Sequence, residues 1–346
     1  MAGPVIHPGL SRRRFLKSAL AGGSFLCLKG LGAAAPSRRD QETSRSPEVK
    51  YKFRTMSVAH YPELQEDIDR LRRENKLSTN STYRSYIDRM KFQLPKDFPD
   101  AKSVVVLAFF TKLMKVNFQY KGRSHPVVIS PQYYDDGISR EDLIAIVRSE
   151  IIKDDGPRVE PAFGLHLKRM SVRSGLGRYG RNNLCFVDGF GTYITLYAFH
   201  TDFRFPDDHW GEAAMMEACR DCSICYGICP SGAIRRENFV IDAAKCITLY
   251  NEIEGDFPNW ALPGMHNALM GCMKCQARCP ENEKIRDSAG SLEDVTEEET
   301  EKILAGKPDD ALLESLTRKL KGFPPATSRE QFPIFTRNLG ALIRQA

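Results

Sequence analysis

The chain has 346 residues, of which 42% are hydrophobic and 27% are charged, as in ordinary globular proteins. Its formal net charge is +6, but residues 1–35 hold five basic side chains and no acidic one. The rest of the chain is therefore close to neutral, so its composition gives no reason to expect a nucleic-acid partner.

The N-terminus has the pattern of an export signal. Residues 11–17 match the twin-arginine (Tat) motif in every position, and a weakly apolar stretch over 18–31 leads to small residues at 33–35. A membrane anchor is the alternative, but glycines and a lysine interrupt a stretch shorter than the ~20 apolar residues that a span needs. We expect a Tat signal over 1–35, recognised by the Tat translocase. This predicts a location in the periplasm or on the outer face of the cytoplasmic membrane.

Residues 36–50 are rich in serine, arginine and acidic side chains and lack periodicity, which is typical of a flexible linker. Residues 51–210 are predicted to form an α+β domain. Its apolar run at 103–110 suits a strand buried on both faces, and Ser139 opens a helix with a capping box. The elements expected there, in chain order, are helices at 68–75 and 82–91, a strand at 103–110, a hairpin of 116–120 and 127–129 about Gly122, helices at 139–152 and 167–174, and strands at 184–187 and 193–199.

A glycine-rich loop follows the last of these helices. Gly175, Gly177 and Gly180 have the spacing of a dinucleotide fingerprint, but that motif follows a strand and opens a helix. The order here is the reverse, so we reject NAD binding. Glycines still allow the backbone to approach a bound group closely. Gly175, Gly177, Gly180 and Asn182 are therefore predicted to bind a cofactor.

Eight cysteines between positions 219 and 279 have the spacing of a double iron–sulfur motif. The first four form C-x2-C-x2-C-x3-C-P, and after a lone cysteine the last three form C-x2-C-x3-C-P. In such a run three thiolates bind one cubane and the fourth reaches the other. The spacing therefore predicts two [4Fe–4S] clusters, one on Cys219, Cys222, Cys225 and Cys279 and the other on Cys229, Cys246, Cys272 and Cys275.

Other uses of these cysteines explain the spacing less well. Zinc sites also use C-x2-C pairs, but they do not need three cysteines at successive spacings with an interleaved fourth. Disulfides, which are common in exported proteins, need no such spacing either. Of the two remaining cysteines, Cys27 lies in the signal. Cys185 lies in an apolar strand and is expected to be a small buried hydrophobe.

The cysteine motif defines a ferredoxin-like module over 211–285, and a helical tail is predicted over 286–346. A capping box at Thr296 opens a helix that ends before Gly306, and a second helix is expected at 310–320. The predicted fold class is thus α+β, with an N-terminal α/β domain, the double-cluster module and the helical tail.

The glycine loop at 174–182, the strand pair that ends at Asp202 and the cysteine spacing together resemble epoxyqueuosine reductases and reductive dehalogenases. Both families have these motifs in this order, and the resemblance covers roughly 160–285. The Tat pattern favours the dehalogenase side, since those enzymes are typically exported in this way. The resemblance implies a corrinoid (cobalamin) in the N-terminal domain, supplied with electrons by the nearer cluster.

The resemblance also implies catalytic candidates. Epoxyqueuosine reductases have a general acid in an Asp-x-x-Pro-Val stretch shortly before the glycine loop, and Asp155 lies in the nearest equivalent, farther from the loop. Dehalogenases use a tyrosine as proton donor beside a basic residue. Tyr179 and Arg181 are the candidates for that pair, with Tyr133 and Tyr134 as further tyrosines.

Two functions remain open on this basis. The first is an iron–sulfur electron-transfer protein or oxidoreductase that works with a redox partner protein or a membrane electron donor. The second is a corrinoid-dependent reductase with cobalamin over the glycine loop. A purely structural role for the clusters ranks last, because two linked cubanes are an elaborate brace for a chain of this size.

Overall fold

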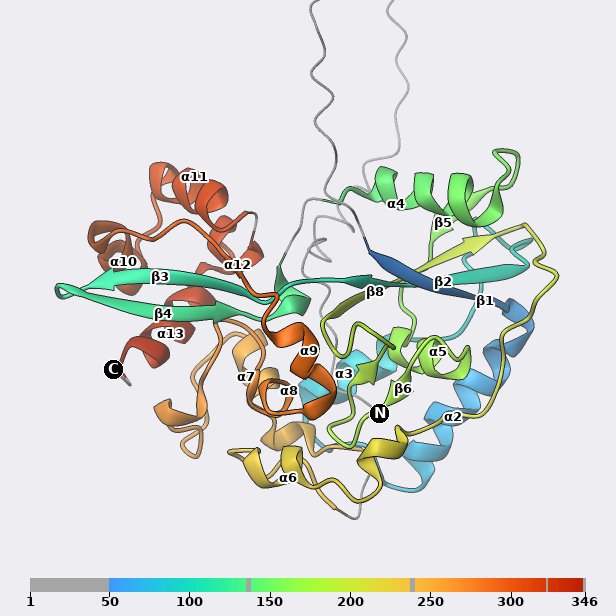
Figure 1. Cartoon of the computed structure of the whole chain (residues 1–346), viewed down its shortest axis with the longest axis horizontal. Helices are drawn as coiled ribbons and strands as arrows, with labels where there is room; N and C mark the ends of the chain where they lie inside the picture. Colours follow the sequence, from blue (N-terminus) through green and yellow to red (C-terminus); the bar gives the residue numbers. More distant parts are fainter. Residues whose placement is uncertain (1–49, 135–137, 237–239, 322, 345–346) are drawn as a thin grey trace, which may run out of the picture.

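The computed structural model describes residues 50–134, 138–236, 240–321 and 323–344. The predicted Tat signal lies outside these residues, as does the predicted linker apart from its last residue. Within the described ranges, no helix combines the length and the apolar character that a membrane span requires. The chain forms two lobes side by side, and in the view of Figure 1 the cysteine-rich segment lies below the second lobe and beside the lower helices of the first.

A four-stranded antiparallel sheet forms the first lobe. Its strand order is β1-β2-β8-β5. The strands are β1 (Tyr51–Ser57), β2 (Ser103–Phe110), β5 (Val159–Pro161) and β8 (Ile194–Thr201). The predicted strand at 103–110 is confirmed, and seven of its eight residues are buried. The edge strand β1 was not predicted.

Helices cover both faces of this sheet, because side chains alternate along its central strand. Val104, Val106 and Ala108 of β2 belong to one hydrophobic cluster, and Val105 and Leu107 belong to another. The first cluster is covered by α2 (Tyr61–Arg73), α3 (Ser81–Arg89) and α5 (Leu167–Arg173). The second is covered by α4 (Arg140–Ile146) and its π-helical continuation Val147–Ile152.

The predicted hairpin about Gly122 is confirmed. Strands β3 (Met114–Tyr120) and β4 (Arg123–Ile129) pair antiparallel, and β9 (Gly290–Ser291) adds in parallel to β3. Lys121 and Gly122 both have positive φ, at 50° and 68°, as the tightest hairpin turns require.

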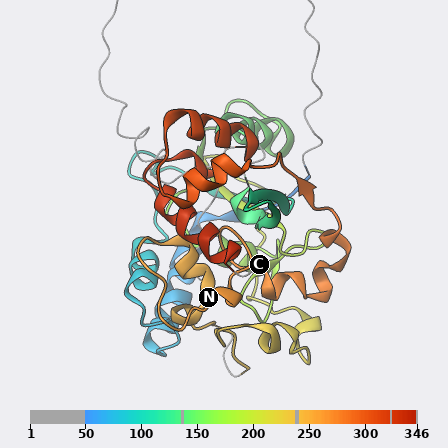
Figure 2. The ribbon, with the colours of Figure 1, turned by 90° about the vertical axis from the view of Figure 1, so that its left-hand side faces the viewer.

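The hairpin packs mainly against the C-terminal helices, while Val128 of β4 joins a small cluster to which Phe110 of β2 also belongs. Phe118 of β3 meets Phe335 of the last helix, with 6.1 Å between ring centroids. The helices are α10 (Glu297–Leu304), α11 (Asp310–Lys319), α12 (Pro324–Thr327) and α13 (Phe332–Ile343). The predicted helical tail is therefore part of a second lobe, whose hydrophobic core it shares with a hairpin from the 51–210 region. Figure 2 shows these helices above the cysteine-rich segment.

The cysteine-rich segment consists of short elements joined by loops. It contains α6 (Ile224–Ile228), α7 (Ile247–Glu252), α8 (Lys274–Ala277) and α9 (Glu283–Arg286). The small ribbon β6 (Arg178–Tyr179) with β7 (Cys185–Phe186) precedes β8 in the chain and is joined to the start of this segment by backbone hydrogen bonds of Tyr179 with Ala214 and Met216. Four 3-10 turns lie in the described part of this segment: Glu217–Cys219, Ala243–Lys245, Pro263–Met265 and Pro280–Asn282. Elsewhere in the described chain, 3-10 turns occur at Val58–His60 and Pro131–Tyr133.

The capping boxes at Ser139 and Thr296 are both present, so those two predicted helix starts are confirmed. The last helix, α13, was not predicted. It buries seven of its residues, and its apolar side chains favour one face to about the same degree as those of α10 and α11.

Candidate metal centre

The structure brings the first predicted set of four cysteines together. Cys219 ends a 3-10 turn, Cys222 lies in the loop after it, Cys225 lies on α6 and Cys279 precedes the turn Pro280–Asn282. The thiol of Cys225 is close enough to interact electrostatically with the thiols of the other three.

The second predicted set is also brought together. The thiol of Cys246, at the start of α7, interacts with those of Cys272 and Cys229, and Cys275 on α8 interacts with all three. Cys275 also interacts with Cys225 of the first set. The two sets are therefore neighbours, and this pair links them.

Buried thiols of this kind stay protonated at neutral pH unless a metal replaces the proton. Burial, and to a smaller extent the neighbouring thiols, raises the pKa of both Cys225 and Cys246 to about 11. The pKa of Cys275 is raised for the same two reasons. Iron bound by these sulfurs would remove the mutual repulsion of the thiolates.

A cavity of about 110 Å³ separates the four thiols of the second set, and all four cysteines line it. Its walls are largely apolar, with Ile234, Ala243 and Leu249 among the lining residues, and none of the described residues that line it is acidic. In the part of the chain described, no three His, Cys, Asp or Glu side chains converge closely enough to hold a single ion. This arrangement suits a cubane, whose four iron atoms take one thiolate each, better than a zinc ion.

One cation reaches this cavity from the first lobe. Lys168, in the first turn of α5, lines the cavity and donates a hydrogen bond of 3.0 Å from Nζ to the carbonyl oxygen of Asn183. Burial lowers the pKa of Lys168 to about 8, while the thiols of Cys185 and Cys246 act in the opposite direction. Sequence reasoning did not single out Lys168.

Arg181, a predicted catalytic candidate, attaches the first cysteine loop to the glycine loop. Its guanidinium donates to the carbonyl oxygens of Cys219 at 2.6 Å, Arg220 at 2.9 Å and Cys222 at 2.9 Å. A planar group with five donors can hold several carbonyls at once, so this side chain fixes the shape of the loop.

The glycines of the loop approach protein atoms of β7. A Cβ at Gly177 would lie 2.6 Å from Cys185 Sγ, and one at Gly180 would collide with the ring of Phe186. Gly175 has φ +71° and ends α5, where a left-handed residue is usual. Asn182 is the one member of the predicted cofactor-binding group that faces the cavity.

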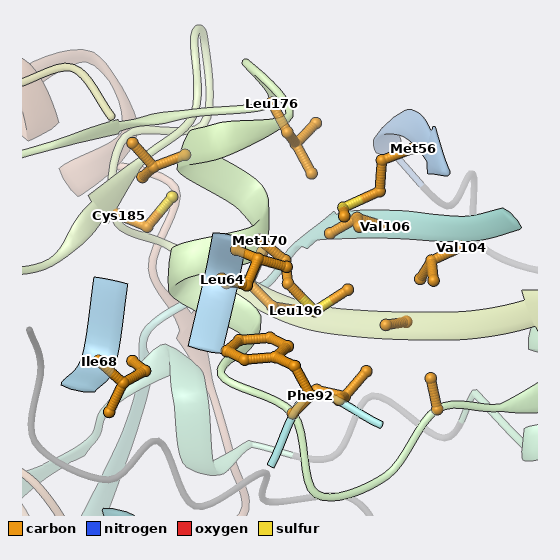
Figure 3. Packing of buried hydrophobic residues seen from close by; sticks show 14 of the residues in the cluster. Met56, Leu64, Ile68, Phe92, Val104, Val106, Met170, Leu176, Cys185 and Leu196 are labelled. Atoms are coloured by element: carbon orange, nitrogen blue, oxygen red, sulfur yellow. The ribbon is translucent and has the colours of Figure 1, made fainter. Parts of the chain in front are cut away.

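Cys185 is 3% exposed and lies in the hydrophobic cluster of the first lobe, beside Leu176 and Met170 in Figure 3. The prediction that it is a small buried hydrophobe is confirmed.

The remaining catalytic candidates lie apart from one another. Asp155 is exposed in a turn before β5 and does not line the cavity. Tyr179 is buried beside Arg169, and burial raises the pKa of its hydroxyl. Tyr133 lines the cavity, where its ring lies against Gly271. The structure therefore does not assemble Asp155, Tyr179 and Arg181 into one pocket.

Asn267 is a further residue that the sequence did not reveal. Its Nδ2 donates to Cys272 Sγ at 3.3 Å, and its Oδ1 accepts from the backbone of Met273 at 2.7 Å. Hydrogen bonds to cysteine sulfur tune cluster potentials. A lone asparagine in an irregular loop carries no signal that would have identified it.

Comparison with known proteins supports a domain with two iron–sulfur clusters in this region. Residues 218–282 match the family of 4Fe-4S double cluster binding domains. An epoxyqueuosine reductase of Bacillus cereus is 26% identical over 197 residues, which are 53% of this chain and 49% of the relative. That of Escherichia coli K12 is 36% identical over 114 residues, or 33% of this chain and 29% of the relative. The chain thus spans about half or less of these curated relatives.

Solved structures of epoxyqueuosine reductases share the fold. The enzyme of Bacillus subtilis, in a form with its catalytic loop swung out of the active site, aligns with a TM-score of 0.58 and 19% identity. That alignment covers 84% of this chain and 77% of the other. An epoxyqueuosine reductase with a modified tRNA stem loop aligns with a TM-score of 0.58 at 18% identity, covering 84% and 76%.

Proposed function

We propose that this iron–sulfur protein carries one [4Fe–4S] cluster on Cys219, Cys222, Cys225 and Cys279 and a second on Cys229, Cys246, Cys272 and Cys275. When bound, each cluster supplies a one-electron redox centre. The observation that carries the proposal is the grouping of the eight thiols into two neighbouring sets of four, the second around its own cavity.

Exposed side chains flank the first set, which gives the electron path a direction. Ile224 and Tyr226, on either side of Cys225, are 44% and 40% exposed. The second set is walled by buried residues such as Ala243 and Ile247. Electrons would enter at the first set, from a redox partner protein or a membrane donor that docks over Ile224 and Tyr226. They would continue past the Cys225–Cys275 contact to the second set.

Export by the Tat pathway is part of this proposal and rests on the motif at 11–17. Because that pathway carries folded proteins, clusters could be inserted before export. Replacing Arg12 and Arg13 by lysine should keep the protein in the cytoplasm, as measured by cell fractionation. Unchanged export of that variant would exclude the Tat route.

A corrinoid-dependent reductase is the second candidate function, and the similarity to epoxyqueuosine reductases favours it. The residues predicted to hold the corrinoid do not fit one well. Atoms of β7 fill the space beside Gly177 and Gly180, so no bound group can approach them from that side. Asn182 faces the cavity of the second cysteine set.

The second candidate function, a corrinoid-dependent reductase, brings with it a tRNA partner to test. The charge of the chain gave no reason to expect nucleic acid, but a protein of the same fold has been solved with a tRNA stem loop, which counts against that expectation. Binding of a labelled tRNA anticodon stem loop, measured by fluorescence anisotropy at two salt concentrations, tests it directly.

The deciding experiment is the iron, sulfide and cobalt content of anaerobically purified protein from cells supplied with cobalamin. About eight iron atoms per chain, reducible by dithionite with the fold intact, are expected for two redox-active cubanes. A protein with zinc in place of iron would overturn the proposal. One cobalt in addition to the iron would establish the corrinoid candidate.

A further inference from the structure

Lys168 differs from every other buried basic side chain in the described ranges. Four lysine or arginine side chains are buried, and three of them have carboxylate partners: Arg169 with Asp67 at 2.5 Å, Arg173 with Glu63 at 3.1 Å and Lys319 with Glu299 at 2.7 Å. Lys168 is 8% exposed, and no ion pair joins it to a carboxylate of the described chain.

The surroundings of Lys168 leave most of its hydrogen-bonding capacity unused. An ammonium group has three donors, and the described contacts use one of them, toward the carbonyl of Asn183. Asn183 has φ +61°, so the end of the glycine loop adopts a left-handed turn at the residue whose carbonyl accepts this bond. Removing an ammonium from water without a counter-charge costs several kcal/mol. An anion beside the ammonium of Lys168 would offset this cost.

The cavity beside Lys168 is the place where such an anion would lie. Lys168 lines it together with Cys229 and Cys246, and among the described residues no acidic side chain shares the lining. Lys274 also lines this cavity, but it is only half-buried, so solvent screens its charge more strongly. A cubane with four thiolate ligands carries net negative charge in both oxidation states and gains one more negative charge on reduction.

We propose that Lys168 is a positioning residue for electron transfer, whose buried ammonium is the counter-charge of the second cluster and raises the reduction potential of that cluster relative to the first. This rests on the proposed function. The step is a single electron passing from the reduced first cluster to the oxidised second one, and it needs no proton. The cation favours the product because the added charge lies beside it in a region of low dielectric constant.

The cation beside the first cysteine set, Arg181, is a weaker counter-charge than Lys168. Arg181 donates to three backbone carbonyls there, so its donors are directed at the loop, and the residues on either side of Cys225 are exposed. Two cations of one segment, 168–181, thus serve the two sets differently. One fixes a loop near the surface, and the other faces the second set in the interior.

The test is a redox titration of the anaerobic holoprotein followed by electron paramagnetic resonance, with iron content measured on the same samples. Lys168→Met keeps the length of the side chain and removes the charge, whereas Lys168→Arg keeps the charge. We expect Lys168→Met to disfavour reduction of the second cluster about tenfold, or about 59 mV for a one-electron couple. The first cluster should change little, and Lys168→Arg should restore most of the shift. Lys319→Met, a buried lysine of the other lobe, is the matched control and should move neither potential.

Each outcome decides the matter. Two clusters at unchanged potentials in Lys168→Met overturn the inference and leave the proposed function intact. Loss of the second cluster in Lys168→Met with its retention in Lys168→Arg upholds the need for the charge. Loss in both variants shows that the size of the side chain matters and not its charge, and the inference fails. A wild-type protein without two clusters removes the proposed function itself.

Discussion

The two cysteine sets use the same ligand chemistry in different surroundings. The first is formed by a loop and the short helix α6 near the surface, and one arginine from the glycine loop holds that loop in place. The second surrounds a cavity with apolar walls, a buried lysine and an asparagine directed at a sulfur. Identical ligands therefore need not give equivalent redox centres, because charge and solvent around the sulfurs set the potential.

The largest effect is expected from Cys229→Ala, which tests whether the sets are divided as proposed. Cys229 follows the first three cysteines in sequence but interacts with Cys246, Cys272 and Cys275 in space. The variant should lose the second cluster and keep the first, so that roughly four of about eight iron atoms remain. Loss of the first cluster's resonance with the second intact would contradict the division. Cys185→Ala, in the hydrophobic cluster, should keep all the iron and serves as the control.

Arg181→Ala should affect the first set alone. The variant removes hydrogen bonds from a charged donor to the loop carbonyls, each worth about 1.5–3 kcal/mol. We expect faster loss of the first cluster to an iron chelator, followed by absorbance and electron paramagnetic resonance, with the second cluster unaffected. Arg181→Lys should recover part of the lifetime, since an ammonium cannot hold several carbonyls in the same plane. Equal lability of both clusters would show that the loop is not held specifically by Arg181.

Gly177→Ala should disturb both sets to a similar extent, because the glycine loop carries Arg181 to the first and Asn182 to the second. The new Cβ would lie 2.6 Å from Cys185 Sγ and 2.7 Å from the carbonyl oxygen of Phe186. Overpacking of this kind costs roughly 1–3 kcal/mol of unfolding free energy. Denaturant unfolding measures it, with Gly211→Ala, which meets nothing within 4 Å, as the control. A destabilisation no larger than that of the control would mean that the loop has room to move.

The smallest effect is expected in the second lobe, remote from both sets. Burial raises the pKa of Glu299, but hydrogen bonds from Lys319, Ser315 and Thr296 outweigh it and lower that pKa to about 2. A carboxylate with a depressed pKa stabilises the fold above its unfolded pKa of 4.5, and this contribution is lost as the pH falls toward 2.

Glu299→Gln should therefore lower stability by about 1–2 kcal/mol at neutral pH, and the difference from wild type should vanish in strong acid. Urea unfolding at a series of pH values measures this. Both cluster potentials should stay unchanged. A shift in either potential would mean that the second lobe is coupled to the cysteine sets and contributes to the difference between them.

Several features of the fold could be read from local sequence, because they depend on neighbouring residues. The continuous apolar run of β2 predicts a doubly buried strand, Gly122 predicts the hairpin, and the side chains of Ser139 and Thr296 satisfy the first amides of their own helices. Helix α13 was missed, although its apolar residues favour one face about as strongly as those of α10 and α11.

The sequence by itself determined the chemistry of this protein, because cysteines at these spacings select iron–sulfur clusters through covalent chain geometry over a few residues. Only the tertiary structure decided what surrounds them. Lys168 and Arg181 come from a segment well before the cysteines, and their distances to the two sets depend on how the first lobe packs against the cysteine-rich segment. Electrostatic energies vary steeply with distance and burial, which no local pattern encodes. The same packing left Asp155 exposed in a turn and closed the glycines at 177 and 180 against β7.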